Sequence, residues 1–587
     1  MFAAWIAALI GAAAIAAAWR GADGAIPHLW PSALGLAALG ALLVARSLSV
    51  SESGLFLTRH VLLSLTPLLG FVLGPSSAAD DGWEPLLYAA FALAFALHAV
   101  VALLTVAPRV DDRRIAWLLA ATLLTAQMML VSYTALAIMP EADEPHYLIL
   151  AQSIALDRDL DLSNNYSVER YGGFYPARLP DAHAIQSGPA LLPIRDLGLP
   201  LVAALPYAAG GRLLVLKLIA ILAAIVVAQL YLLLRDLRVS PRVAVSAVAI
   251  VALSQPFHTY ATQIYPEILV TLGGLLAVRA MRRGTAMSLG SAAFAGLMIA
   301  TLPWFTTRAW FFAAGLALTL GFLLTVPILR GGARLAAARR LGFAAIPGAA
   351  LIGLLLLVNW QVFGLPIPGA GFFLVSDQQE VLSGEPLLGA GGLFFGRVFG
   401  LIGRAPIFLL IFIGLATVLR RPAEHRPELA ALIVGWSMHF AFIASLEHWH
   451  SDWAPPSRNL VATIPFLALA VAAGLETLRA ANWPRVLGVV LVAAACWSLT
   501  VTLLFSADPY MRYELPERLR GGEPAQLWRV AQDTVGMDVA RLLPRTTTQT
   551  PSTTPLLLIW LGVGAGLALW GWRATTRMQG ARTATER

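Results

Sequence analysis

Three carboxylates, one histidine and one tyrosine fall within the seven residues from Glu141 to Tyr147. A carboxylate in a cavity can act as a general base and take a proton from an attacking hydroxyl. Asp143 is the candidate for that role. Aspartate is also a preferred N-cap residue, and a helix that starts at Glu144 would use Asp143 simply as its cap. Spacing alone leaves both interpretations open.

The element that must position this cluster is the apolar run before it, Ile115 to Ile138. A run of that length is typical of a membrane span. Carboxylates at its end therefore lie at the water interface or line a polar cavity, because carboxylates facing lipid are costly. After Asp143, the apolar residues Leu148, Ile149 and Ile154 are spaced as in a short helix on the membrane surface.

The composition indicates a polytopic membrane protein. Of 587 residues, 58% are hydrophobic and 13% are charged, whereas a soluble protein of this length carries more charge. The formal net charge of +8 comes almost wholly from arginines scattered over short loops, which gives no support to a nucleic-acid-binding domain. The single cysteine, Cys496, lies in an apolar run and excludes a disulfide framework and a thiolate metal site.

The apolar runs predict an all-α polytopic membrane protein with about sixteen transmembrane helices. The first run lacks a charged start and a cleavage site, which indicates a retained helix and not a signal peptide. The predicted spans are 1–19, 29–46, 60–78, 84–107, 115–138, 211–234, 243–257, 265–281, 286–302, 308–328, 341–360, 404–420, 428–446, 459–478, 484–505 and 554–572.

Arginines gather in alternate loops, and the positive-inside rule predicts that these loops and both termini are cytoplasmic. The opposite loops are long and rich in His, Trp, Tyr, Asp and Glu, a composition that is usually functional in long loops. The chemistry is therefore expected on the outer face. The outer segments are 139–199, 255–267, 303–308, 361–403, 447–458 and 506–553.

Two acidic stretches raise the question of a metal ion. Asp157, Asp159 and Asp161 alternate and would share one side of an extended segment, which suits a hard cation. The segment Glu447 to Asp452 has two histidines and two carboxylates, which are zinc ligands. Charge runs are more often solvated loops, and the aromatic neighbours of the histidines indicate an interfacial belt. We expect no metal and no other cofactor.

Several motifs resemble one family. Asp143-Glu-Pro-His-Tyr147, at the start of the first large outer loop, resembles the Asp-Glu-x-His/Arg-aromatic motif of the GT-C glycosyltransferases. The similarity is greatest to the branch of protein O-mannosyltransferases and lipid A aminoarabinose transferases. Weaker matches are Gln152 to Tyr166, Tyr265 to Glu267, Trp304 to Arg308, and Trp453 to Arg458. The chain departs from the pattern by four additional N-terminal helices and by the late motif Pro456-Ser457-Arg458-Asn459, where the family has Gly-Pro-Arg-Tyr.

The resemblance implies a GT-C-type bundle whose outer loops carry short juxtamembrane helices. Its catalytic module would span 115–505. The remaining parts would be extra helices in 1–114, an outer segment at 506–553, and a last helix with a basic tail at 554–587.

The resemblance also implies an activity: inverting transfer of a hexosyl or pentosyl group from a polyprenyl-phosphate donor. The acceptor would be a lipid, a polysaccharide or a protein, at the periplasmic face of a bacterial inner membrane. Membrane lipids would be further partners, and no nucleic acid would be involved.

Carried over residue by residue, the resemblance makes Asp143 the general base and Glu144 a structural or assisting acid, while His146 and Tyr147 shape the donor pocket. Arginine suits the leaving phosphate, and the candidates in order are Arg308, Arg458, and then Arg170 or Arg178. Each arginine is equally an interfacial anchor in the alternative interpretation. Glu267 is a possible second acid, although a carboxylate at a helix start is also favoured by the helix dipole.

Two other functions remain open. A transporter or flippase of lipid-linked saccharides would use ionisable residues at mid-membrane depth, where His439 is the obvious candidate and Lys217 lies near a helix end. A non-catalytic relative that serves as an assembly subunit would keep the fold without needing Asp143.

Overall fold

The structure is a computed structural model. It describes residues 84–179, 182–329, 331, 334–374, 382, 385–420, 426–451, 453–481, 485–513, 525–536, 538–547 and 551–585. The predicted spans 1–19, 29–46 and 60–78 lie outside the described residues.

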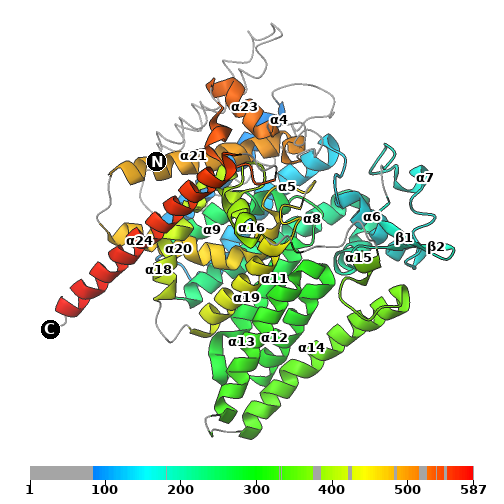
Figure 1. The fold of residues 1–587 in the computed structure, drawn as a ribbon, viewed down its shortest axis with the longest axis horizontal. Helices are drawn as coiled ribbons and strands as arrows, with labels where there is room; N and C mark the ends of the chain where they lie inside the picture. The colour runs from blue at the N-terminus through cyan, green and yellow to red at the C-terminus, as the bar shows by residue number, and fades with distance from the viewer. Residues whose placement is uncertain are drawn as a thin grey trace.

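The described residues form a helical membrane protein with one two-stranded β-hairpin (Figure 1). Every predicted span from 84–107 onward coincides with a helix, so the prediction of an all-helical polytopic membrane protein is confirmed. Nine described helices are long and apolar enough to cross a membrane. They are α4 (Glu84–Val106), α5 (Asp112–Ala137), α8 (Gly198–Asp236), α13 (Trp310–Leu329), α14 (Arg334–Phe363), α19 (Arg426–Ser445), α20 (Ile464–Ala480), α21 (Arg485–Ala507) and α24 (Thr553–Thr585).

Shorter helices complete the bundle, and the total of about sixteen spans stays a prediction. The shorter apolar helices are α9 (Pro241–Ala252), α11 (Glu267–Ala280), α12 (Leu289–Phe305), α16 (Pro386–Phe395) and α18 (Leu410–Leu419). The longest helix, α8, begins well before the predicted 211–234 run and changes direction at Gly210 and Gly211. Gly211 has φ 59° and ψ −153°, a conformation essentially restricted to glycine.

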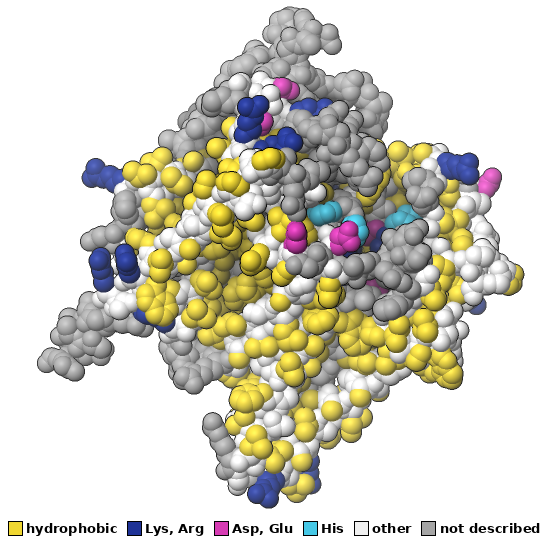
Figure 2. Space-filling model, viewed as in Figure 1, with side chains coloured by type: hydrophobic (Ala, Val, Ile, Leu, Met, Phe, Trp, Pro, Cys, Tyr) yellow, Lys and Arg dark blue, Asp and Glu magenta, His cyan; other side chains and the backbone are white. Residues whose placement is uncertain are grey.

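Small residues set the spacing of the helices, as in other membrane bundles. A Cβ atom added to Gly296 of α12 would lie 2.0 Å from the carbonyl oxygen of Ala344 in α14. One added to Gly414 of α18 would lie 1.9 Å from the carbonyl oxygen of Ala470 in α20. Figure 1 shows α12, α13 and α14 side by side. Hydrophobic side chains cover most of their surface in Figure 2, whereas histidine and acidic side chains gather near the middle of the molecule.

The loops carry short elements that shape the site. The first loop, residues 138–197 between α5 and α8, contains α6 (Glu144–Gln152), η1 (Ser153–Asp157) and α7 (Val168–Tyr171). It ends in an antiparallel hairpin of β1 (Ala184–Ser187) and β2 (Ala190–Pro193). The expectation that this loop carries short helices is confirmed. The other short elements are α10 (Phe257–Tyr260), η2 (Met281–Ala286), η3 (Thr307–Ala309), α15 (Ala370–Leu374), α17 (Leu401–Arg404), η5 (Pro406–Leu409), η7 (Arg458–Thr463), η8 (Pro509–Arg512), α23 (Gln526–Val535) and η9 (Val539–Leu542).

Candidate functional site

Asp143 lies at the N-cap position of α6, but its side chain does not cap the helix. Its backbone is in the right-handed helical region, and its carboxylate makes no cap hydrogen bond. The preceding residue, Ala142, has φ 54°, a left-handed conformation that is uncommon for alanine and costs energy. This turn directs the Asp143 carboxylate into the protein, where it is buried. The cap interpretation therefore does not account for Asp143.

Two guanidinium groups hold the Asp143 carboxylate, one on each oxygen. Arg195 Nη2 donates to Oδ1 at 2.5 Å, and Arg458 Nη1 donates to Oδ2 at 2.6 Å. Burial opposes ionisation of Asp143, but Arg195 and Arg458 outweigh burial and hold its pKa well below the usual range. Asp143 is thus charged at neutral pH.

Arg458 is fixed by a second carboxylate and by an aromatic ring. Its Nε donates to Glu267 Oε1, and its guanidinium lies 4.7 Å from the centre of the Tyr265 ring. Glu267 is the first residue of α11, so the helix dipole also favours its charge. The structure therefore joins Asp143, Glu267 and Arg458, three residues singled out from the sequence, in one buried cluster.

Two histidines stack beside this cluster. The rings of His146 and His183 are 3.6 Å apart and nearly parallel. His146 Nδ1 lies 2.8 Å from the Tyr166 hydroxyl, and Arg195 Nε donates to His183 Nδ1 at 3.1 Å. Burial, reinforced by Arg195, lowers the pKa of His183 to about 4. Burial also lowers the pKa of His146. Both rings are therefore neutral at pH 7.

Glu144 holds the second loop, residues 253–266. The backbone N–H of Ile264 donates to Glu144 Oε1 at 2.5 Å, and the Tyr513 hydroxyl lies 3.4 Å from Oε2. Burial raises the pKa of Glu144. Because Ile264 directly precedes Tyr265, this contact places the Tyr265 ring beside Tyr147, with ring centres 6.5 Å apart. Glu144 thus has a structural contact that shapes the site.

Arg308 lies next to the cluster without contacting Asp143. Its Nη1 donates to Ser451 Oγ at 2.6 Å and lies 3.4 Å from Oδ1 of Asn459, the residue after Arg458. The neighbouring Thr307 donates its backbone N–H to Asp196, the residue after Arg195, at 2.9 Å. These contacts join the three segments that carry Arg195, Arg308 and Arg458.

The other two arginines that the sequence singled out lie elsewhere on the first loop. Arg170 pairs with Asp157 at 2.9 Å, and its side chain is 40% exposed. Arg178 is exposed. Within the described ranges, no ion pair joins either arginine to Asp143 or Glu267.

Sequence reasoning missed Arg195 and His183. They flank the hairpin, His183 before β1 and Arg195 after β2, and the Ile194 N–H donates to the His183 carbonyl at 3.2 Å. The segment lacks the alternation of a long strand. The signal available in the sequence was Gly188, a glycine between two short segments, as in a tight hairpin turn. In the structure its φ is 60°.

The acidic alternation in the first loop does not converge on one point. Asp157 accepts from Arg170 and Asn165, Asp159 accepts from Ser153, and Asp161 accepts from Ser163 and the Leu191 N–H. In the later loop, His450 stacks on Phe399, and Asp452 lies outside the described residues. No group of three or more His, Cys, Asp or Glu side chains in the described part of the chain is arranged to hold a metal ion.

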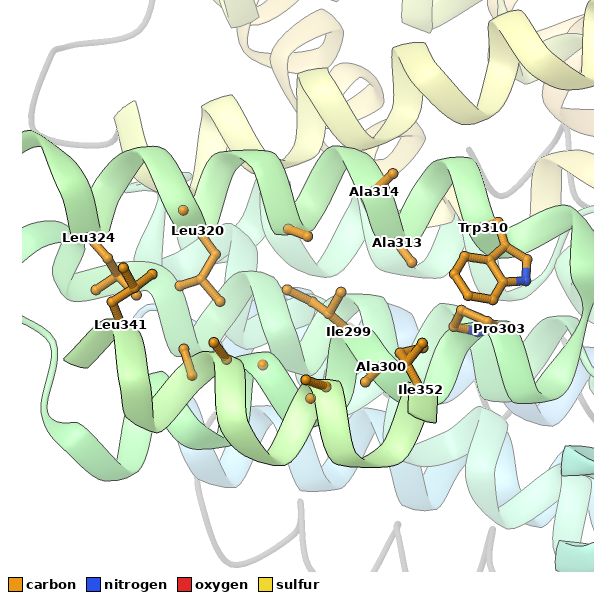
Figure 3. Close-up of a pocket in the computed structure, with 17 residues that line it drawn as sticks. Ile299, Ala300, Pro303, Trp310, Ala313, Ala314, Leu320, Leu324, Leu341 and Ile352 are labelled. Atoms are coloured by element: carbon orange, nitrogen blue, oxygen red, sulfur yellow. The ribbon is translucent and has the colours of Figure 1, made fainter. Parts of the chain in front are cut away.

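An apolar groove of about 320 Å³ runs between α12, α13 and α14 (Figure 3). Small residues such as Ala313, Ala344 and Gly348 form its walls, with Leu324 and Leu341 at one end and Trp310 at the other. The buried indole N–H of Trp310 has no hydrogen-bond partner among the described residues. Trp310 is two residues from Arg308, so this end of the groove lies near the charged cluster.

Comparisons with known proteins found similarity to solved structures. No protein-family model and no curated protein matches the chain. One similar structure is the archaeal oligosaccharyltransferase AglB from Archaeoglobus fulgidus in complex with an inhibitory peptide and a dolichol-phosphate. It has 15% sequence identity and a TM-score of 0.37, over 66% of this chain and 56% of that chain. Another is an Archaeoglobus fulgidus oligosaccharyltransferase in the apo form, with 15% identity and a TM-score of 0.38, over 70% and 58% of the two chains. This chain thus spans less than two thirds of the length of either structure.

Proposed function

We propose that this protein is a membrane glycosyltransferase that moves a sugar from a polyprenyl-phosphate donor to an acceptor, with inversion. The observation that carries the proposal is the Asp143 carboxylate, which is buried, charged, and held by two arginines. Inverting transfer requires one general base and positive charge for the departing phosphate. Both requirements are met by one cluster.

In the proposed step, Asp143 takes the proton of an acceptor hydroxyl while the acceptor oxygen attacks the anomeric carbon of the sugar. The bond between that carbon and the phosphate oxygen breaks, and polyprenyl phosphate leaves with the electron pair. Arg458 and Arg308 are the proposed phosphate-binding residues, because guanidinium groups match phosphate geometry. His146 and Tyr147 line the donor pocket, and Glu267, the second acid of the site, orients Arg458.

The lipid part of the donor requires an apolar path beside the charged cluster. The groove between α12, α13 and α14 supplies apolar walls, and its Trp310 end lies near Arg308. We place the reaction on the outer face of a bacterial inner membrane, where nucleotide sugars are absent and lipid-linked donors are the available source. The acceptor is a lipid, a polysaccharide or a protein.

The test is sugar transfer in proteoliposomes from a panel of polyprenyl-phosphate sugars. Asp143→Asn keeps the shape of the side chain and removes the base. We expect transfer to fall by about a hundredfold or more, as for loss of a general base. Glu169→Gln is the matched control, because Glu169 is an exposed carboxylate on the same loop, and it should transfer at the wild-type rate.

Other outcomes would favour other functions. Equal transfer by wild type and Asp143→Asn would contradict the role of Asp143. If neither transfers sugar but lipid-linked saccharide crosses the bilayer, the protein is a transporter. If neither activity occurs while a partner complex forms with either variant, the protein is an assembly subunit.

A further inference from the structure

We infer that Arg195 is a phosphate-binding residue that pairs with Asp143 in the unliganded protein and exchanges this carboxylate for the donor's phosphate. The inference rests on the proposed function and adds to it a coupling between donor binding and release of the base.

The need for an exchange follows from the contacts of Asp143. Each carboxylate oxygen already accepts from a guanidinium group, Oδ1 from Arg195 and Oδ2 from Arg458. A general base must come within hydrogen-bond reach of the hydroxyl whose proton it takes. A carboxylate held by two guanidinium groups is also a weak base, because both groups favour its charged form. One of the two arginines must therefore release its oxygen before proton transfer.

Arg458 is the arginine whose release is costly, because it pairs with two buried carboxylates. Arg458 also pairs with Glu267 and lies over the Tyr265 ring, so its departure would leave two buried carboxylates without it. Such uncompensated burial is strongly unfavourable. When Arg195 departs, Asp143 keeps Arg458, and the other contact of Arg195 described above is to His183, a neutral ring that needs no counter-charge.

The hairpin puts Arg195 in the right place for the exchange. The residue that follows Arg195 is anchored, because Asp196 accepts from both the N–H and the hydroxyl of Thr307, at 2.9 and 3.0 Å. Arg195 directly precedes this anchor and contacts Asp143, and Arg308 directly follows Thr307. A phosphate bound by Arg308 would meet Arg195 after a side-chain rotation, with the backbone in place.

The experiment measures binding of polyprenyl monophosphate without a sugar to the purified full-length protein in nanodiscs, with polyprenol as the uncharged comparison. Arg195→Gln should weaken phosphate binding by about tenfold or more, as expected for loss of charge-assisted hydrogen bonds. Arg195→Lys should recover part of the affinity. Arg158→Gln is the matched control, because Arg158 is an exposed arginine of the same loop.

The decisive variant is Asp143→Asn. If Asp143 and phosphate compete for Arg195, removing the carboxylate charge should tighten phosphate binding by several-fold or more. This gain should disappear in the double variant Asp143→Asn/Arg195→Gln. A purely structural role of Arg195 predicts that any gain in Asp143→Asn persists in the double variant, because Asp143→Asn also frees Arg458.

The outcomes separate the two proposals. If wild type binds polyprenyl phosphate better than polyprenol, but Arg195→Gln binds it equally well or Asp143→Asn shows no gain, the exchange is wrong and the proposed function stands. If wild type binds polyprenol and polyprenyl phosphate alike, the proposed function fails together with the exchange. Should Arg195→Gln not fold, Arg195→Lys and Asp143→Asn still decide the question.

Discussion

Arg458 is the residue on which the charge balance of the site depends. It is buried and forms ion pairs with both Asp143 and Glu267. Arg458→Gln would leave two carboxylates in a low-dielectric environment without this partner. We expect a loss of stability of about 3–5 kcal/mol, as for removal of one member of a buried ion pair.

Thermal unfolding of the detergent-purified protein measures this loss. Arg458→Lys should lose less stability than Arg458→Gln, because lysine keeps the positive charge. It should still be less stable than wild type, because lysine lacks the forked geometry of arginine. An unfolding temperature of Arg458→Gln equal to that of wild type would show that the two carboxylates do not depend on this arginine.

His183 should make the protein less stable in mild acid. Its pKa is about 4 in the fold and 6.5 in the unfolded chain. Between these values the unfolded chain binds a proton that the folded protein does not, so stability falls as the pH drops from 6.5 to about 4. The shift corresponds to at most about 3 kcal/mol. Asp143, whose folded pKa is depressed, adds its own loss only below its unfolded value near 4.

Unfolding temperatures measured from pH 7 to pH 4 test this prediction. His183→Gln should reduce the pH dependence of stability in this range without abolishing it, since His146 also has a lowered pKa and contributes with the same sign. An unchanged slope in the variant would mean that His183 is protonated in the folded protein.

At the scale of elements, glycines at helix crossings should be intolerant of a methyl group. In Gly296→Ala the new Cβ would approach the Ala344 carbonyl oxygen within 2.0 Å, so α12 and α14 would have to separate. We expect a loss of about 1–3 kcal/mol, as for other overpacked sites. The control is Gly353→Ala in α14, where nothing lies within 4 Å of the added atom and helix propensity favours alanine. The unfolding temperature of Gly353→Ala should equal or exceed that of wild type, and that of Gly296→Ala should be lower.

The helices were predictable from the sequence because each is an apolar run of sufficient length. The boundaries of α8 were not, since Pro206, Gly210 and Gly211 look like a break, yet the helix continues across them with a change of direction. The hairpin was missed because its strands are four residues each and lack regular alternation.

The same limit applies to the site. Asp143, Glu267 and Arg458 were identified from motifs, but their pairing depends on how three distant segments pack. Arg195 had no motif, and its contact with Asp143 follows only from the closure of the hairpin. The motifs thus identified the two acids of the site and Arg458, while tertiary packing alone brings Arg195 to them.

At the scale of the molecule, the alternation of arginine-rich loops predicts which face each loop occupies. The test uses single cysteines in a Cys496→Ser background and a membrane-impermeant thiol reagent on intact cells. Ser187→Cys, at the exposed tip of the hairpin, should be labelled, whereas Thr285→Cys, in the exposed connection between α11 and α12, should be labelled only after lysis. The reverse pattern would place the charged cluster on the cytoplasmic face.

The separation of the Asp143 partners along the chain also has a consequence for biosynthesis. Arg195 follows Asp143 by 52 residues, and Arg458 follows it by 315. At roughly 5–20 residues per second, a ribosome delivers Arg195 about 3–10 s after Asp143, but Arg458 only about 15–60 s after it. During that interval the first loop already contains a partner for its own carboxylate, while Glu267 emerges long before Arg458. The nascent chain must therefore keep the Glu267 carboxylate hydrated until most of the bundle has been synthesised.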